Sequence, residues 1–407
     1  MDVSKIRKDF AVLSREIGGK LPIYFDSACQ TLRPRQVTDA IVEYYESYPA
    51  CAGRSVHKLA TEVSLKCDAV RSRVAEFFNA ENPTDIAFMK NATEGLNTVI
   101  FGSGLKAGDE VVTTDYEHNS VHVPVLEVVR TVGVRHRMVR SAKDGTFDIE
   151  AFEKVMSKKV KLVTMCLTSN VTGYTLPAKE IVDIAHSYGA KVLLDAAQAA
   201  PSRKVDVKAL DVDFMAASAH KMCGPSGVGL LYVRGDLGES ISPRIFGGHG
   251  VTDTNVASFE LLPPPERFET GLQNYSGIVG TGAAIQYISS IGLDEILDHE
   301  ITLNKRMTRA LINSDAVSIM GPSDPNLRGG LFSFNVKALS AHDVAMILDN
   351  SKNIMMRSGM HCCHAYFHMR GIEGCARVSV YIYNTREEVD VLTEAVKDLT
   401  DKFSAGS

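Results

Sequence analysis

The sequence predicts an α/β fold with a mainly parallel sheet that is covered by helices on both faces. Apolar runs that end in polar residues alternate with helical segments, and this order repeats from Asp85 to about Val233. Buried parallel strands are near-continuous apolar runs, and ligands bind at the carboxyl edge of such sheets. We therefore expect the polar ends of the strands to meet in one pocket. The predicted strands are Asp85–Met89, Glu110–Thr114, Lys161–Leu167, Lys191–Asp195 and Asp213–Ala217.

Composition limits the class of protein. The chain has 407 residues, 45% hydrophobic and 23% charged, which is enough for two domains and a large core. The net charge is -5 and basic runs are missing, so nucleic acid is not an expected partner. No apolar run reaches the roughly 20 residues of a membrane span, and the first ten residues lack the apolar core of a signal peptide. We expect a cytoplasmic protein without a membrane partner, and the eight scattered cysteines indicate reduced thiols.

The segments outside the predicted sheet indicate a second, smaller domain. Apolar residues at helical spacing predict a helix from Ser4 to about Ile17, another over Thr61–Asn79 and a third over Leu293–Leu311. The segment Arg244–Gly280 is rich in Gly and Pro and is expected to be a loop. Alternating runs near the end of the chain predict strands of a small α+β domain. We expect a large domain over 20–290 and a small domain made of 1–19 and 291–407.

Asp195 and Lys221 are the first candidate site residues. Asp195 ends one apolar run, and Lys221 follows Ser218 and His220 at the end of the next. Partial burial lowers the pKa of a lysine amine, which suits Schiff-base chemistry, and an aspartate can meet a pyridinium nitrogen. The alternative is a solvated loop lysine and a helix-capping aspartate.

The motifs Asp195–Gln198, Ser218–Lys221 and Gly224–Gly229 resemble the core of the class V aminotransferases, which belong to the fold-type I pyridoxal phosphate enzymes. Within them the chain is most similar to the cysteine desulfurases of the Suf type. The likeness extends from about Tyr24 to about Leu399. It implies a seven-stranded, mainly parallel sheet and pyridoxal 5'-phosphate as the cofactor.

The resemblance also assigns cofactor-binding roles. It implies that Thr93 and Glu94 belong to a phosphate-binding turn at a helix N-terminus, although Thr93 could simply cap the helix. His118 matches the histidine over the cofactor ring and is also a catalytic candidate. Asn170 matches the residue that bonds the ring hydroxyl, and its alternative role is that of a turn residue. Gln198 belongs to the same cofactor-binding set.

Further cofactor contacts are expected around the lysine. Ser218, His220 and Thr93 would anchor the phosphate, Asp195 would hold the ring nitrogen, and Lys221 would form the Schiff base and move the substrate proton.

The segment Arg357–His364 is similar to the family loop that carries the nucleophilic cysteine, and Cys362 matches that nucleophile. We expect His361 and Arg357 to favour its thiolate by charge. Arg377 matches the arginine that binds the substrate carboxylate. The remaining candidate substrate-binding residues are Arg357, Asn170 and His57. The segment Arg54–His57 resembles a family segment near the substrate entrance, although Arg54 and His57 could be surface polar groups.

The chain also departs from the family pattern. Met360 replaces a common histidine, and Cys363 with His364 replaces the residues usual after the nucleophile, so either cysteine could carry sulfur. Leu272 replaces a threonine in a segment that relatives use to contact the phosphate of a neighbouring subunit. That contact is therefore open, or the backbone or Gln273 makes it. Cys29 replaces a small residue, and we expect it to be a packing residue.

These observations lead to one main hypothesis and two alternatives. The hypothesis is a homodimeric cysteine desulfurase that converts L-cysteine to L-alanine through a persulfide on Cys362 and supplies sulfur to an acceptor protein, for iron–sulfur cluster or other cofactor assembly. The first alternative is a selenocysteine lyase or another class V lyase or aminotransferase. The second is a metal-binding protein, in which ligands would come from His361, Cys362, Cys363, His364, His368 and Cys375, although adjacent ligands fit zinc poorly.

Overall fold

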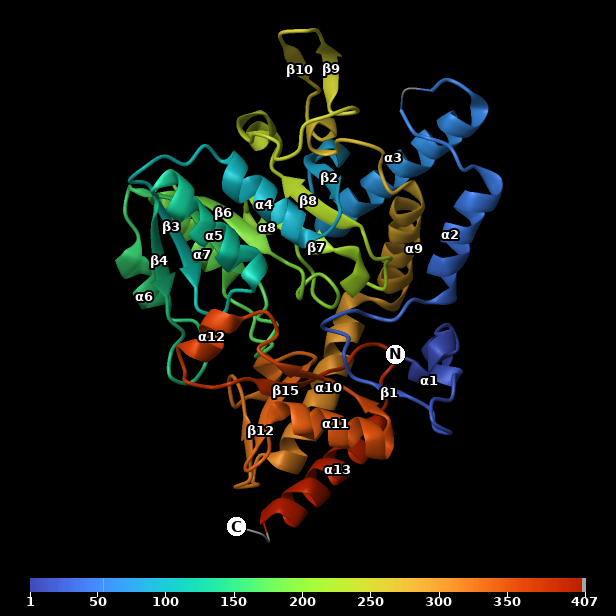
Figure 1. The fold of residues 1–407 in the computed structure, drawn as a ribbon, viewed down its shortest axis with the longest axis vertical. Helices are drawn as coiled ribbons and strands as arrows, with labels where there is room; N and C mark the ends of the chain where they lie inside the picture. Colours follow the sequence, from blue (N-terminus) through green and yellow to red (C-terminus); the bar gives the residue numbers. More distant parts are fainter. Residues whose placement is uncertain (54, 405–407) are drawn as a thin grey trace.

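The computed structural model describes residues 1–53 and 55–404, and its centre is the predicted sheet (Figure 1). Within these ranges seven strands form this sheet in the order β2-β8-β7-β6-β5-β3-β4. β8 is antiparallel to both neighbours, and the remaining neighbours pair in parallel. The predicted α/β fold class is therefore confirmed. The strands are β2 (Ile86–Met89), β3 (Glu110–Thr114), β4 (Arg135–Val139), β5 (Val160–Cys166), β6 (Lys191–Asp195), β7 (Phe214–Ser218) and β8 (Gly229–Val233).

Helices cover both faces of the sheet because successive strand residues point to opposite sides and are apolar on each. In β6, Leu193 belongs to one hydrophobic core and Leu194 to the other. One core includes residues of α4 (Ala92–Gly102) and α5 (Asn119–Val132). The second core lies on the opposite face and includes residues of α2 (Arg35–Ser47), α3 (Lys58–Phe78), α6 (Ile149–Val155), α7 (Ala178–Ser187), α8 (Val207–Leu210) and α9 (Tyr275–Ile291).

A smaller α+β unit lies below the sheet in Figure 1 and has its own core. Its antiparallel sheet has the order β11-β12-β15-β14. The proposed division into 20–290 and the two flanking ranges stays a prediction. β1, which falls within 20–290, pairs in parallel with β13 of the range 291–407. The elements of this unit are β1 (Ile23–Tyr24), α10 (Leu293–Leu311), β11 (Val317–Ile319), β12 (Leu331–Val336), α11 (Ala341–Lys352), β13 (Ile354–Met355), β14 (Arg357–Gly359), α12 (His364–His368), β15 (Cys375–Ser379) and α13 (Arg386–Ser404).

Two predicted segments differ from the structure. The single helix expected from Ser4 to Ile17 is wrong, because α1 ends at Arg7 and a 3₁₀ helix follows only after Phe10. Phe10 turns inward and packs edge-on against the rings of Tyr287 and Tyr383, so tertiary packing overrides the helical spacing.

The expected loop of 244–280 contains regular structure. It holds the hairpin of β9 (Val251–Thr254) and β10 (Phe259–Leu261), which projects from the top of the molecule in Figure 1, and the start of α9. Among the described residues, no helix combines the length and the apolarity needed to cross a membrane.

Candidate active site

A cavity of about 240 Å³ lies at the carboxyl edge of the central sheet. Asp195 and Ser218 are the last residues of β6 and β7, so the sheet delivers both side chains to this place. The segment with Arg357 and Cys362 forms another part of its wall. The cavity brings together most of the predicted site residues, namely Thr93, His118, Asn170, Asp195, Gln198, Ser218, His220, Lys221, Arg357, Cys362 and Arg377.

Lys221 and Asp195 line this cavity together and influence each other electrostatically. Lys221 ends the 3₁₀ helix that follows β7. Removal from water lowers the pKa of the Lys221 amine, and the Asp195 carboxylate opposes this shift. Asp195 is 6% exposed and accepts a hydrogen bond from the backbone N–H of Ala197 at 2.9 Å. Burial raises the pKa of Asp195, against the influence of that hydrogen bond and of Lys221. The cavity therefore contains a lysine amine whose lowered pKa suits a nucleophile, together with a buried carboxyl group.

The N-terminus of α4 offers an anion-binding surface in the cavity. Ser218 Oγ accepts the first backbone N–H of the helix at 2.8 Å, and the hydroxyls of Thr93 and Ser120 lie 2.7 Å apart. Gly229 is required beside this turn, since an added Cβ would lie 2.4 Å from the carbonyl carbon of Asn91. A helix N-terminus with nearby hydroxyls favours a phosphate group.

Two histidines of the cavity are neutral. Burial, followed by the charges of Lys221 and Arg377, lowers the pKa of His118 to about 3. Its Nδ1 accepts the backbone N–H of Ser120 at 3.0 Å, so the neutral ring carries its proton on Nε2. Burial also lowers the pKa of His220 to about 4. His220 can therefore bind a phosphate by hydrogen bonding and not by charge.

Asn170 connects the sheet edge to the cysteine loop. Its amide Nδ2 donates to the carbonyl of His361 at 2.8 Å, and the thiol of Cys363 donates to its Oδ1 at 2.7 Å. Gln198 donates through Nε2 to the carbonyl of Ala28 at 2.8 Å. The cofactor roles of Asn170 and Gln198 stay predictions.

The cysteine loop presents one thiol to solvent and buries the next. His361 and Cys362 have φ values of 49° and 58°, in the left-handed region, where non-glycine residues are uncommon. Cys362 is exposed, whereas Cys363 is fully buried. The carbonyl of Cys362 accepts the backbone N–H of Asn119 at 2.7 Å, which ties the loop to α5.

The expectation that His361 favours the Cys362 thiolate by charge is wrong. His361 is buried, and burial together with nearby arginines lowers its pKa to about 3, so its ring is neutral. Its Nε2 faces Cys375 instead, 3.1 Å from the carbonyl oxygen and 3.2 Å from the sulfur. Arg357 lines the cavity together with Cys362, and its expected influence on this thiol stays a prediction.

Arg377 places a second guanidinium at the cavity. Its side chain is 2% exposed, Nη1 donates to the carbonyl of Asn170 at 2.9 Å, and Nη2 lies 3.4 Å from Asp26. Its Nε has no hydrogen-bond partner among the residues that the structure describes. A buried donor without a partner is costly unless a ligand meets it, and a carboxylate fits a guanidinium.

Comparison with known proteins identifies the family. The sequence profile of the family described as "Aminotransferase class-V" matches residues 23–392. The chain belongs to this family.

Relatives extend over the whole chain. A Streptomyces coelicolor protein named "Probable cysteine desulfurase" is 38% identical and covers 99% of this chain and 98% of its own. The apo structure of a cysteine desulfurase from Thermococcus onnurineus NA1 superposes with a TM-score of 0.93 at 37% identity and covers 98% of each chain. A mutant of C-DES with glycine covalently linked to the PLP cofactor has a TM-score of 0.83 at 25% identity and covers 96% of this chain and 99% of that one.

Two predicted residues of this class-V enzyme lie outside the cavity. The Glu94 carboxylate accepts the backbone N–H of Lys90 at 2.6 Å beside the start of α4. His57 is exposed and caps α3, where its Nδ1 accepts the backbone N–H of Ala60 at 3.3 Å. Arg54, which the resemblance places near the substrate entrance, lies outside the described residues. The roles of Glu94 and His57 stay predictions.

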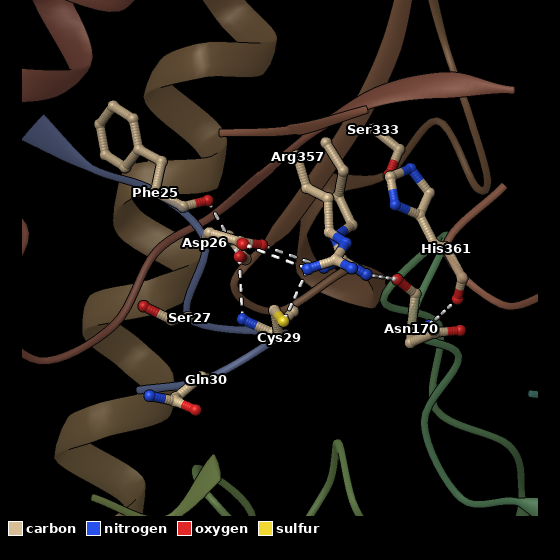
Figure 2. Close-up of polar contacts among 12 residues, drawn as sticks. Phe25, Asp26, Ser27, Cys29, Gln30, Asn170, Ser333, Arg357 and His361 are labelled. Atoms are coloured by element: carbon tan, nitrogen blue, oxygen red, sulfur yellow. Dashed lines mark hydrogen bonds and ion pairs between the residues drawn. The ribbon is translucent and has the colours of Figure 1, made fainter. Parts of the chain in front are cut away.

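Sequence reasoning missed a polar contact of Cys29 at the cavity. The packing interpretation is wrong, because Cys29 is half-buried and lines the cavity, and Arg357 Nη1 donates to its sulfur at 2.7 Å (Figure 2). The same Nη1 lies 3.5 Å from Asp26. The sequence did contain a signal for this position. The segment Asp26–Cys29 comes just after the short apolar strand β1, in the same way that polar site residues come after the strands of the large sheet.

Leu272 and Gln273 belong to the segment that relatives use to contact a neighbouring subunit. Leu272 is 77% exposed, and the amide of Gln273 donates to the carbonyl of Glu269 at 2.8 Å.

The metal-binding alternative requires several ligand side chains to converge on one point. In the ranges 1–53 and 55–404, no group of three or more His, Cys, Asp or Glu side chains is arranged to hold a metal ion.

Proposed function

We propose that this class-V enzyme is a pyridoxal phosphate-dependent cysteine desulfurase that converts L-cysteine to L-alanine and retains the sulfur on Cys362. The observation that carries the proposal is the shared cavity: an exposed thiol, Cys362, lines the same space as the half-buried Lys221 and the buried Asp195. The curated and solved relatives named cysteine desulfurases support this reaction.

The residues present fit pyridoxal phosphate. Lys221 supplies the amine for the covalent bond, Asp195 an acid for the ring nitrogen, and the start of α4 with Thr93 and Ser218 a seat for the phosphate. When bound, the cofactor supplies a ring that withdraws electrons from the substrate carbon next to the amino group.

The side chains then have distinct tasks. Lys221 moves the proton of the substrate α-carbon, because burial favours its unprotonated amine. Asp195 would stabilise a protonated ring nitrogen when the cofactor is bound. His118, neutral and protonated at Nε2, exchanges a proton in the cavity, and Arg377 binds the substrate carboxylate.

The sulfur step belongs to Cys362. Its thiolate attacks the sulfur of the bound substrate, a sulfur–sulfur bond forms and the carbon–sulfur bond breaks. The carbon regains a proton and leaves as alanine, and the protein holds a persulfide. Arg357 stabilises the anionic sulfur by its charge.

A cysteine variant tests this function. Cys362→Ala should lower alanine formation in the presence of a reductant by about 10²-fold or more, with cofactor content unchanged, because the attacking thiolate is lost. Cys51→Ala is the matched control, since Cys51 is exposed and lies outside the cavity. Full alanine formation by Cys362→Ala would contradict the persulfide mechanism, and sulfide release by that variant would indicate a C–S lyase. A higher kcat/KM for selenocysteine than for cysteine would favour the selenocysteine lyase.

A second copy of the chain and an acceptor protein are the proposed partners. Apolar side chains in and beside the β9–β10 hairpin are unusually exposed, which suits a homodimer interface. They are Ile245, Phe246, Val256, Phe259 and Leu272.

The exposed position of Cys362 suits sulfur transfer to an acceptor protein that builds iron–sulfur clusters or other sulfur-containing cofactors. All eight cysteines are free thiols, in keeping with the cytoplasm that we propose as the location.

A further inference from the structure

Cys29 is a second thiol in the proposed active site. It lies in the turn after β1, where its backbone N–H donates to the carbonyl of Asp26 at 3.1 Å. Its side chain is partly accessible and lines the same cavity as Cys362 and Lys221. The tasks assigned to the other residues do not use this thiol.

One guanidinium connects the two thiols of the cavity. Arg357 donates to the sulfur of Cys29 at 2.7 Å and also interacts electrostatically with Cys362. Figure 2 shows Cys29 and Asp26 on the same side of Arg357. A guanidinium N–H that already points at a sulfur atom is a charged hydrogen-bond donor for an anionic sulfur held there.

The charges around Cys29 leave a surplus of positive charge. Arg357 and Arg377 both pair with Asp26, at 3.5 Å and 3.4 Å, so two guanidinium groups share one carboxylate. Arg377 lines the cavity and is almost fully buried, so it brings a second guanidinium to the same space. Charge-assisted hydrogen bonds of this kind stabilise an anionic sulfur such as a persulfide.

The loop of Cys362 is suited to exchange with a neighbour. Cys362 is exposed and its backbone has a left-handed conformation, whereas Cys363 is held in the core by Asn170. Access governs the rate of thiol exchange together with thiolate content. Cys29 is therefore the accessible thiol that shares the cavity with Cys362, and Cys363 is engaged elsewhere.

We propose that Cys29 is a second sulfur-carrying residue, which takes the outer sulfur of the Cys362 persulfide and holds it beside Arg357. The inference rests on the proposed desulfurase function. The Cys29 thiolate attacks the outer sulfur, a new sulfur–sulfur bond forms at Cys29, and the bond at Cys362 breaks. Cys362 leaves as a thiolate and takes up the proton that Cys29 lost, so the step needs no oxidant or reductant. Cys362 is then free to accept sulfur from a second substrate.

The test counts and maps the sulfur on the holoenzyme. With excess L-cysteine and neither reductant nor acceptor, wild type should form about two alanines per chain in the initial burst, because each chain stores two sulfurs. Trypsin places Cys29 alone on the peptide Leu21–Arg35 and Cys362 with Cys363 on Ser358–Arg370. After alkylation, both peptides should carry one additional sulfur.

The variants separate the two thiols. Cys29→Ser and Cys29→Ala should halve the burst to about one alanine per chain and keep sulfur on Cys362. Cys362→Ser should leave both peptides unmodified, because sulfur reaches Cys29 only through Cys362. The matched control Cys51→Ser should behave as wild type. Cofactor content and circular dichroism establish that each variant is folded.

The outcomes distinguish this inference from the proposed function. A wild-type burst of one alanine, with sulfur on Cys362 and an unmodified Cys29 peptide, would overturn the Cys29 role and leave the desulfurase function intact. Sulfur on Cys29 in Cys362→Ser would overturn the order of transfer. If wild type forms neither alanine nor protein-bound sulfur, the proposed function fails and the role of Cys29 fails with it.

Discussion

The cavity has two walls that are built in different ways. The cofactor wall, formed by Asp195, Ser218 and Lys221, stands at the ends of two neighbouring strands of a sheet that is buried on both faces. The thiol wall, formed by Cys29, Arg357 and Cys362, comes from turns and from β14, the short edge strand of the small sheet. Cys362 is exposed there and has a left-handed backbone.

This difference matches two different tasks. A covalently held cofactor requires fixed positions, which buried strand ends provide at low cost in mobility. A sulfur carrier must reach both a substrate inside the cavity and an acceptor outside it, and exposed loops are the more mobile elements of proteins. We therefore expect changes in the cofactor wall to impair cofactor function and with it every step of the reaction, and changes in the thiol wall to impair the sulfur step while cofactor binding stays intact.

The largest effect is expected at Lys221. Lys221→Ala should lower alanine formation by about 10²- to 10⁴-fold, because the group that moves the substrate proton is lost. The variant should also lose the yellow colour of the lysine-bound cofactor. Lys204→Ala is the control, since Lys204 is largely exposed. Turnover by Lys221→Ala above one tenth of the wild-type rate would contradict the claim that the cofactor wall is required for the reaction.

A smaller effect is expected at the other end of the cofactor wall. Asp195→Asn should reduce turnover by about 10²-fold, because an amide cannot stabilise the positive charge on the ring nitrogen. Cofactor content and activity measured together check this, with Asp183→Asn on an exposed part of α7 as the control. An unchanged rate would show that the buried acid only supports the fold.

The pH dependence of His118 sharpens the comparison further. Because burial lowers the pKa of His118 to about 3, its ring is protonated in only about 1% of the protein molecules at pH 5, and in fewer at higher pH. Wild type and His118→Gln should therefore show the same apparent pKa values between pH 5 and 8, and differ about tenfold in rate. A change of slope near pH 6.5 in the pH–rate profile of wild type, absent from that of His118→Gln, would contradict this. It would mean that the His118 ring is exposed to water and gains its proton near the ordinary pKa of histidine.

The smallest effect is expected at His57, which lies outside both walls. His57→Ala removes the cap of α3 and should lower the free energy of unfolding by about 0.5–1 kcal/mol in denaturant titrations. Glu62→Ala, exposed on the same helix, is the control. A tenfold fall in kcat/KM for cysteine would instead support the substrate role that the resemblance implies.

The cofactor wall could be predicted from local sequence, whereas the thiol wall could not. Asp195 and Lys221 follow apolar runs within a few residues, so strand pattern alone brought them to one sheet edge. Cys29 and Arg357 are 328 positions apart, and no local pattern connects them.

The neutral His361 illustrates the same limit. Its proximity to Cys362 in sequence suggested a cation, but burial against Cys375 decides its protonation, and burial is a property of the folded chain. The helix expected at the N-terminus failed for a similar reason, because the packing of Phe10 on distant tyrosines decides where α1 ends.

The central claim is that Lys221, facing Asp195, is the residue that binds pyridoxal phosphate. The most direct test is to add the cofactor, reduce the protein with borohydride and map the modified peptide by mass spectrometry. We predict a pyridoxyl group on Lys221. Modification of a different lysine, or a protein that takes up no cofactor, would contradict the claim.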